Sequence, residues 1–192
     1  MPNDTPKTLC YAGTLFDSDK HLLIESLTLL KTRNSVHFPQ TVLIGEHGVA
    51  ESIRQQLSIT VTGRLATLDE VYQQFFAADF ALLPMRVSQA NKARWPSKIT
   101  DYWAAGLPVI ATPVSDFEEL FFKHNLGILA NSDSVDAYSA ALQTALEMPE
   151  AERTRLSKSA RKFAETELDW EVLAKRLIKL YQKTIEDTKH RL

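Results

Sequence analysis

The sequence predicts an α/β protein: a Rossmann-like open parallel sheet of about six strands with helices on both faces and further helices at the C-terminal end. Three observations support this prediction. Short apolar runs alternate with amphipathic segments between Thr8 and Leu129, at the spacing of βαβ units. The predicted strands are apolar throughout, as parallel strands covered on both faces are. After Ser134 only segments with helical periodicity follow.

Each predicted element has a local basis in the sequence. Leu23, Leu27 and Leu30 fall on one face of the first predicted helix, and Gly106 ends the fourth. The predicted strands are 8–15, 41–45, 59–63, 80–84, 108–112 and 127–129. The predicted helices are 21–33, 50–57, 68–77, 97–105, 117–123, 135–148, 150–166 and 170–189.

Composition restricts the class of protein. The chain has 192 residues, enough for one domain with a real core, and its formal net charge of -2 argues against a nucleic-acid-binding surface. A single cysteine, Cys10, allows no internal disulfide and lies in an apolar run, where we expect it to be buried. No signal peptide and no membrane span are apparent, so we expect a cytoplasmic protein without a transmembrane segment.

The segment 85–98 has the most uneven charge of the chain, because it contains four cationic residues and no acidic residue. It leads directly into a predicted helix that starts at Pro96 and Ser97, residues typical of a first turn and of a cap. Free N–H groups at a helix start beside cations form an anion site, whereas the alternative is a solvated basic loop. The cations of the segment are Arg86, Lys92, Arg94 and Lys98.

Two further features follow the first predicted strand. Gly13 and Thr14 end it, and a glycine there allows the backbone to approach a phosphate, although an ordinary tight turn is the simpler interpretation. Asp17-Ser18-Asp19 looks like a D-x-D metal motif, but its place before an apolar-periodic run favours helix capping. No histidine has metal-ligand spacing, and hydrolase, P-loop and dinucleotide fingerprints are absent, so neither a metal nor another cofactor is predicted.

Several motifs, in this order, resemble the C-terminal domain of the group 1 (family four) glycosyltransferases, which have the two-domain GT-B fold. The resemblance covers nearly the whole chain, and its most specific part is the carboxylate–aromatic–x–Ala–Gly–x–Pro–Val segment from Asp101 to Val109. The segments that carry it are YAGTL (11–15), LIGEHG (43–48), VTGRL (61–65), FAADFALLP (76–84), PSKITDYWAAGLPVIATPVSDFEEL (96–120), LGILAN (126–131) and the closing helices 158–182.

The resemblance implies a site for a nucleotide-diphospho-sugar donor. Asp101 matches the second acid of the family's E-x7-E motif, which holds the ribose hydroxyls, and Gly13 matches the glycine that approaches the diphosphate. Ser97 and Lys98 occupy the helix start that faces the phosphates and the sugar. Gly63 and Arg64 match the strand end near the nucleobase, and Glu119 matches a family acid at the start of the next helix.

The sequence departs from the family pattern at three positions. Ala93 stands where the first acid of E-x7-E belongs, and Thr14 stands where the family has an arginine. The family's Lys-Gly pair is at best Lys20 followed by His21. Lys98 and Arg94 are candidates to replace the missing phosphate and sugar ligands.

The resemblance also implies an activity and a partner. The family's enzymes are hexosyltransferases of the retaining type, used in polysaccharide biosynthesis, and carry an N-terminal acceptor domain before the strand with which this sequence nearly begins. We therefore expect 1–192 to be one donor-binding domain, inactive alone, and the acceptor to be a saccharide or lipid-linked. Three explanations are open: the sequence is a fragment, a separate acceptor-binding domain or subunit supplies the other half, or the protein no longer catalyses. Association with the inner face of the membrane would then occur through that partner.

The alternatives to a transferase belong to two other classes of function. One is a non-catalytic binding or regulatory module with the same fold. The other is a receiver-type domain, which the absence of an aspartate after the strands FALLPM and VIATPV disfavours. The apolar face of the last helix, with Val172, Leu173, Leu177, Leu180 and Tyr181, predicts a large apolar patch near the rim of the cleft.

Overall fold

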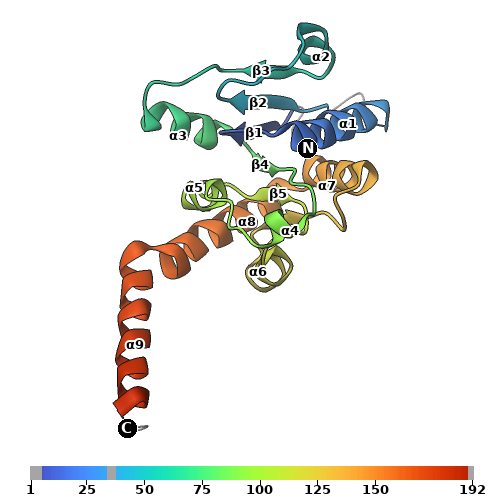
Figure 1. Ribbon diagram of the computed structural model, residues 1–192. Helices are drawn as coiled ribbons and strands as arrows, with labels where there is room; N and C mark the ends of the chain where they lie inside the picture. The colour runs from blue at the N-terminus through green and yellow to red at the C-terminus, as the bar shows by residue number, and fades with distance from the viewer. Residues whose placement is uncertain (1–5, 34–37, 190–192) are drawn as a thin grey trace.

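The computed structural model describes residues 6–33 and 38–189 and confirms the predicted α/β fold (Figure 1). One six-stranded sheet has the order β3-β2-β1-β4-β5-β6, and every pair of neighbouring strands is parallel. The order reverses between β1 and β4, which makes that boundary the switch point of the sheet. The strands are β1 (Thr8–Ala12), β2 (Gln40–Ile44), β3 (Ile59–Val61), β4 (Phe80–Leu83), β5 (Val109–Ala111) and β6 (Gly127–Leu129).

Helices cover both faces of the sheet, and the C-terminal third is helical (Figure 1). The helices are α1 (Asp17–Arg33), α2 (Glu51–Gln56), α3 (Leu68–Ala77), α4 (Gln89–Lys92), α5 (Lys98–Ala104), α6 (Phe117–His124), α7 (Val135–Glu147), α8 (Glu150–Phe163), the π-helix η1 (Ala164–Leu168) and α9 (Trp170–Lys189).

Alternate residues of the strands feed two separate cores. In β4, Phe80 and Leu82 pack with the leucines of α1 and with α7, whereas Ala81 and Leu83 pack with α3, α5, α6 and α8. Cys10 is fully buried in the second of these cores, as predicted. Because both faces of each central strand are buried, the strands need the continuous apolar sequence that identified them.

Glycines are needed at two positions of positive φ. Gly106, with φ +69°, follows α5 and donates to the carbonyl of Trp103, while Leu107 donates to that of Tyr102. These two bonds form a Schellman C-cap, so the predicted helix end is confirmed. At Gly127 a Cβ atom would lie 2.0 Å from the carbonyl oxygen of Val109, so only glycine allows β6 to pair there.

The segments 17–19 and 85–98 differ from the sequence prediction. Helix α1 begins at Asp17, so the Asp-Ser-Asp run forms its first turn rather than a cap. Within the basic segment, which we predicted as a loop, Ser88 caps a short helix by accepting from the N–H of Asn91. Ser97 has helical φ and ψ and makes no side-chain cap bond, so its predicted capping role is wrong.

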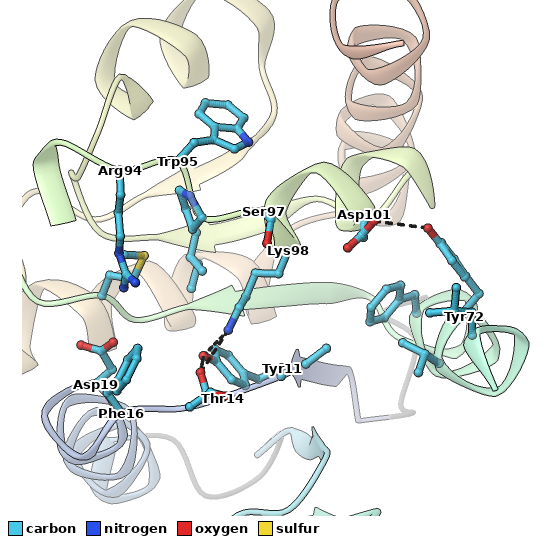
Figure 2. A pocket seen from close by; sticks show the side chains of 18 residues that line it. Tyr11, Thr14, Phe16, Asp19, Tyr72, Arg94, Trp95, Ser97, Lys98 and Asp101 are labelled. Atoms are coloured by element: carbon cyan, nitrogen blue, oxygen red, sulfur yellow. Dashed lines mark hydrogen bonds between the residues drawn. The ribbon is translucent and has the colours of Figure 1, made fainter. Parts of the chain in front are cut away.

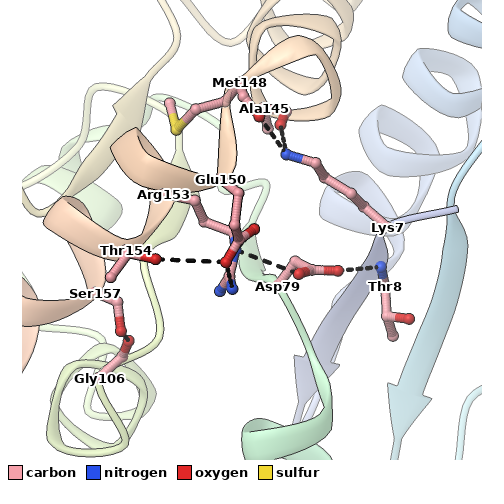
Figure 3. Close-up of polar contacts among 10 residues, drawn as sticks. All are labelled: Lys7, Thr8, Asp79, Gly106, Ala145, Met148, Glu150, Arg153, Thr154 and Ser157. Atoms are coloured by element: carbon pink, nitrogen blue, oxygen red, sulfur yellow. Dashed lines mark hydrogen bonds and ion pairs between the residues drawn. The ribbon is translucent and has the colours of Figure 1, made fainter. Parts of the chain in front are cut away.

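A polar network joins α7 and α8 to the amino ends of β1 and β4 (Figure 3). Lys7 Nζ donates to the carbonyls of Ala145 and Met148 at 3.1 and 2.7 Å. These two bonds provide a donor for carbonyl groups at the C-terminal end of α7. Asp79 accepts from the N–H of Thr8 at 2.8 Å and pairs with Arg153 at 3.4 Å. We call these six residues the amino-end clamp. Each charged member has its partner within the clamp or in α8, so the clamp is a structural feature.

Helix α9 projects from the body of the domain (Figure 1). Leu177, Leu180 and Tyr181 are exposed, as are Ile178 and Ile185. Helix α9 contacts η1, a π-helix that the sequence did not predict. An exposed apolar face on the last helix is therefore confirmed, whereas the size of the patch and its place at the rim of the cleft stay predictions. No described helix is long and apolar enough to cross a membrane.

Candidate functional site

A pocket of about 490 Å³ opens at the carboxyl ends of β1 and β4, where the strand order reverses (Figure 2). Its walls come from the end of β1, from α3, from the segment before α5 and from the first turn of α5. We call it the switch-point pocket. It is lined by Tyr11, Ala12, Gly13, Thr14, Phe16, Asp19, Leu68, Val71, Tyr72, Phe75, Leu83, Met85, Arg94, Trp95, Pro96, Ser97, Lys98 and Asp101.

The pocket brings together six of the ten residues that the sequence singled out. They come from the loop after β1, from the basic segment and from the first turn of α5, and their roles in donor binding stay predictions. Parallel strands end at the same edge of a sheet, which is why residues after β1 and before α5 meet although they are distant in sequence. The six residues are Gly13, Thr14, Arg94, Ser97, Lys98 and Asp101.

Lys98 is held against the end of β1 in the centre of the pocket (Figure 2). Its Nζ donates to the Tyr11 hydroxyl and to the carbonyl of Thr14, the latter at 3.2 Å, and lies 4.0 Å from the centroid of the Tyr11 ring. Tyr11 in turn donates to the same Thr14 carbonyl at 2.5 Å. Burial lowers the pKa of Lys98 to about 8, an effect that Asp19 opposes.

The backbone at Gly13 leaves room beside this ammonium group. Gly13 has φ +82°, and a Cβ there would lie 3.7 Å from Lys98 Nζ. Its N–H already donates to the carbonyl of Ile44 at 3.1 Å, so the glycine contributes access rather than a spare donor. A ligand can therefore approach Lys98 over the glycine without meeting a side chain.

Asp101 lies one turn further along α5, at the opposite end of the pocket from Arg94 (Figure 2). The Tyr72 hydroxyl on α3 donates to Asp101 Oδ1 at 3.4 Å. Partial burial raises the pKa of Asp101, while the bond from Tyr72 acts in the other direction. The second carboxylate oxygen has no hydrogen bond within the described residues, so Asp101 can accept bonds from a ligand hydroxyl.

The wall beside Asp101 is apolar and aromatic. Helix α3 contributes Leu68, Val71, Tyr72 and Phe75, and the indole of Trp95 closes the side near α5. Leu68 is 75% exposed. This wall offers a flat ring a surface to pack against.

The other end of the pocket contains Arg94 and Asp19. The guanidinium of Arg94 lies 5.7 Å from the centroid of the Phe16 ring. Asp19 is buried and accepts from the N–H of Arg86 at 3.0 Å, which fixes the start of the basic segment over α1. Arg86 itself donates to the carbonyl of Asp133 at 2.8 Å and does not line the pocket. The carboxylate of Asp19 thus holds the backbone of the basic segment, a role that the sequence did not suggest.

Four of the predicted site residues lie outside the switch-point pocket. Lys20 and Arg64 line a second pocket on the other side of Gly13 and Thr14. Gly63 pairs with Gly45 in an isolated bridge between the loops after β2 and β3. Glu119 is exposed on α6 and lines neither pocket.

Sequence reasoning missed several side chains that line the switch-point pocket. Tyr11 lies in an apolar run, so the sequence indicates only that it is buried; in the structure it is buried and its hydroxyl also reaches the loop after β1. Tyr72 and Leu68 were assigned to the helix but not to the site. Helix α3 carries more apolar residues than one buried helix face requires, and this excess was the only signal in the sequence that its exposed side could belong to a site. Ala93, where the family has its first acid, ends α4, is exposed and does not line the pocket.

The sequence predicted no metal site. Within residues 6–33 and 38–189 no group of three or more His, Cys, Asp or Glu side chains could hold a metal ion. Asp17 pairs with Lys20 at 2.8 Å, and Asp19 binds backbone, so the two aspartates of the D-x-D run have protein partners.

The parallel sheet, its strand order and the pocket at its switch point define a Rossmann-like α/β domain. Residues 6–148 match the family model described as Glycosyl transferases group 1, so the chain belongs to this family. A search of curated proteins by sequence gives no match.

Solved structures of GT-B glycosyltransferases have the same fold. WaaG, a glycosyltransferase involved in lipopolysaccharide biosynthesis, is 21% identical with a TM-score of 0.65 and aligns over 86% of this chain and 44% of its own. Sucrose-phosphate synthase from Thermosynechococcus elongatus is 21% identical with a TM-score of 0.67, over 97% of this chain and 47% of its own. This chain thus spans less than half the length of either enzyme.

A third similar structure has nearly the same extent as this chain. It is the C-terminal domain of a group 1 glycosyltransferase, LpcC, from Francisella tularensis. It is 15% identical with a TM-score of 0.66, and the alignment covers 86% of this chain and 89% of that domain. The fold described here therefore corresponds to the C-terminal half of a GT-B enzyme.

Proposed function

We propose that the chain binds a nucleotide-diphospho-sugar in the switch-point pocket and contributes to glycosyl transfer onto a saccharide or lipid-linked acceptor. The observation that carries the proposal is the order of groups along one pocket. Lys98 Nζ lies beside Gly13, and Asp101 follows one turn later on α5. The apolar wall of α3 comes next. This order matches that of phosphate, ribose and base in a nucleotide.

Lys98 and Arg94 would bind the diphosphate. Both are cations of the pocket, and Gly13 leaves space for the phosphate oxygens at Lys98. When the sugar–phosphate bond breaks, negative charge increases on the departing nucleoside diphosphate, and nearby cations stabilise that charge more than the ground state. No side chain of this chain is assigned to proton transfer.

Asp101 would bind the ribose, and the wall of α3 would bind the base. A carboxylate with one oxygen already held by Tyr72 has acceptor capacity left for a hydroxyl pair. Leu68 and Tyr72 supply a partly exposed apolar surface for a heterocycle. Neither contact reads a base edge, so these contacts do not select one nucleobase.

The rest of the reaction is proposed from the family. The resemblance to this family implies hexosyl transfer with retention at the anomeric carbon, and we propose that this chain takes part in it without a metal or other cofactor. We propose that 1–192 acts as one donor-binding domain and that a separate acceptor-binding domain or subunit completes the site, since the chain spans 44% and 47% of two GT-B enzymes. The setting we propose is the cytoplasm, at the inner face of the membrane through that partner.

Calorimetric titration of the chain with UDP, GDP, ADP and inorganic diphosphate tests the donor site. We expect saturable binding of at least one nucleoside diphosphate. The proposal fails if no nucleotide binds, or if binding is unchanged when Lys98 and Asp101 are both replaced by alanine.

The chain alone should transfer no sugar. A GT-B site must hold the acceptor against the anomeric carbon, and such positioning lowers a barrier by roughly 7–11 kcal/mol at best. A turnover assay with nucleotide sugars and a panel of acceptors checks this expectation, and robust transfer by the chain alone would contradict it.

The second candidate function is a binding or regulatory module that does not catalyse. Ala93 favours the non-catalytic module: it stands where the family pattern has an acid, and it is exposed and outside the pocket. Supplying an acceptor domain distinguishes the two functions: turnover that depends on Lys98 supports the transferase, and nucleotide binding without turnover supports the module.

A further inference from the structure

Helix α9 has an apolar face that the rest of the described chain leaves uncovered. Every side chain from 174 to 188 is exposed. A helix in a protein gains most of its stability by packing its apolar face, so we expect a surface outside this chain to cover that of α9. The large apolar side chains of the helix are 48–84% exposed, and they are Trp170, Leu177, Ile178, Leu180, Tyr181 and Ile185.

These side chains lie together on one side of the helix. At 3.6 residues per turn they span an arc of roughly 160°, from Leu180 to Ile178, with Trp170 near its centre. Two paired helices need only the narrower stripe of a coiled-coil seam. The apolar face of α9 is therefore wider than one partner helix covers, and it is suited to a broad surface.

The opposite side of α9 is cationic. The segment 172–185 contains no acidic residue, and Glu186 and Asp187 follow only in the last turn. Two of the cations pair with glutamates at 2.8 and 3.7 Å, whereas Lys179 and Lys183 form no ion pair with any residue that the structure describes. The helix thus presents positive charge beside its apolar face. The four cations of the segment are Lys175, Arg176, Lys179 and Lys183.

This combination is complementary to a bilayer surface that contains anionic lipids. Helices that lie in such a surface have Trp and Leu on one face and Lys and Arg on the other. A helix is about 10–12 Å across, close to the Debye length at physiological salt, so cations on its polar side remain in the field of the headgroups. A second copy of the chain would present the same four cations, and pairing of two α9 helices would bring like charges together.

We propose that α9 binds the surface of a bilayer with anionic lipids, its apolar face in the boundary between headgroups and acyl chains. The helix lies along the bilayer, since no described helix is long and apolar enough to cross it. Helix α9 points away from the sheet, which leaves its length available to a flat surface (Figure 1). The inference goes beyond the proposed function, in which a partner reaches the membrane, and does not depend on nucleotide binding.

Flotation of the full chain with lipid vesicles tests this contact. One set of vesicles consists of phosphatidylcholine alone, and the other contains about one part of anionic phosphatidylglycerol to three parts of phosphatidylcholine. We expect the chain to float with the anionic vesicles and to bind the neutral vesicles about tenfold more weakly or less. Raised salt should release it from the anionic vesicles, because salt screens the attraction.

The apolar face is tested by Leu180→Ser. This change should weaken binding to the anionic vesicles by about tenfold or more, the scale of one buried leucine side chain. Phe122→Ser is the matched control, because it removes an apolar side chain that is 91% exposed on α6, and it should leave vesicle binding unchanged. Both side chains are exposed, so urea denaturation should show unchanged stability in both variants.

The cationic side is tested by Lys179→Gln. We expect about fivefold weaker binding to the anionic vesicles, the scale of one cation near a charged surface, and no change with the neutral ones. Lys92→Gln removes an exposed lysine of α4 and should change neither.

The inference is wrong if the chain binds no vesicle, or binds both kinds equally and without an effect of salt. It is also wrong if Leu180→Ser and Phe122→Ser weaken binding equally. A dimer that forms without lipid and that Leu180→Ser dissociates would assign the face to a second copy. Loss of flotation on adding an acceptor domain would assign the face to that domain, and either result overturns the inference. Vesicle binding by a chain that binds no nucleotide leaves the inference standing while the donor proposal fails.

Discussion

The two ends of the sheet use polar side chains in opposite ways. At the amino ends, Lys7, Asp79 and Arg153 have protein partners that account for their charges, as Figure 3 shows. At the carboxyl ends, Lys98 and Asp101 are partly paired and face a cavity, as Figure 2 shows. Charges that satisfy one another contribute to stability, whereas charges that face a cavity retain bonding capacity for a ligand.

This comparison predicts which changes affect binding and which affect folding. Lys98→Ala should weaken diphosphate and nucleotide binding by about 1.5–3 kcal/mol, the scale of a charge-assisted hydrogen bond. The free energy of unfolding should not fall, because burial disfavours the charged form of Lys98, as its lowered pKa indicates, and the substitution removes this buried charge. Calorimetry and urea denaturation measure the two effects.

Lys92→Ala is the matched control for this prediction, since Lys92 belongs to the same basic segment but lines neither pocket. Equal losses of affinity in the two variants would mean that the segment acts only through its net charge.

Asp79→Ala should have the opposite pattern. It leaves the N–H of Thr8 without an acceptor and Arg153 without one of its carboxylates, at a cost of about 1–3 kcal/mol in the free energy of unfolding. Nucleotide affinity should not change. Asp187→Ala on the exposed part of α9 controls for the loss of an aspartate. A loss of affinity with unchanged stability would contradict the assignment of the clamp to structure.

Nucleotide affinity should fall as pH rises above about 8, because the free protein then has to take up a proton at Lys98 before it binds the anion. The slope should approach about tenfold per pH unit until the higher pKa of the bound form is reached. Lys98→Arg should flatten the profile, since arginine stays charged. Titrations between about pH 7.5 and 10, the range in which a lysine of lowered pKa changes charge, measure this effect.

The same pKa shift has a consequence for stability, of opposite sign. In the unfolded chain Lys98 has the ordinary pKa of 10.5, above its value of about 8 in the fold. Between these values the unfolded chain binds more protons, so the contribution of Lys98 to the free energy of unfolding should increase with pH across that range. Denaturation of the wild-type chain and of Lys98→Ala at several pH values isolates this contribution.

The smallest effect is expected at Asp101. Asp101→Ala should weaken nucleotide binding by about 0.5–1.5 kcal/mol, the net value of a typical hydrogen bond, and leave inorganic diphosphate binding unchanged. The reason is that its proposed partner is the ribose, which diphosphate lacks. Parallel titrations with the two ligands decide the point, and equal losses for both would refute the ribose role.

Much of the fold and part of the site could be predicted from the sequence. Continuous apolar runs identify buried parallel strands, and Gly106 marks a helix end whose two backbone bonds the structure contains. Because parallel strands end at one edge, Gly13, Lys98 and Asp101 could be placed together from their positions alone.

The assignment of Lys20 and Arg64 to the same pocket as Lys98 could not be checked from the sequence. Arg64 lies in the loop after β3 and Lys20 in the first turn of α1, near the same edge of the sheet as Lys98, but both reach the other side of Gly13 and Thr14. Strand order tells which edge of a sheet a residue reaches. The side of a loop that it faces depends on how the neighbouring helices pack.

The sequence by itself therefore determined the order of the elements, the edge of the sheet that carries the site, and the backbone freedom at Gly13. Local periodicity and φ preference are properties of short segments, which is why they can be read without a structure. The tertiary structure alone decided that Tyr11 holds Lys98, that Asp19 binds the backbone of Arg86, and that one row of loops encloses two pockets. These are contacts between residues far apart in the chain, and only the packing of α1, α3 and α5 against the sheet sets them.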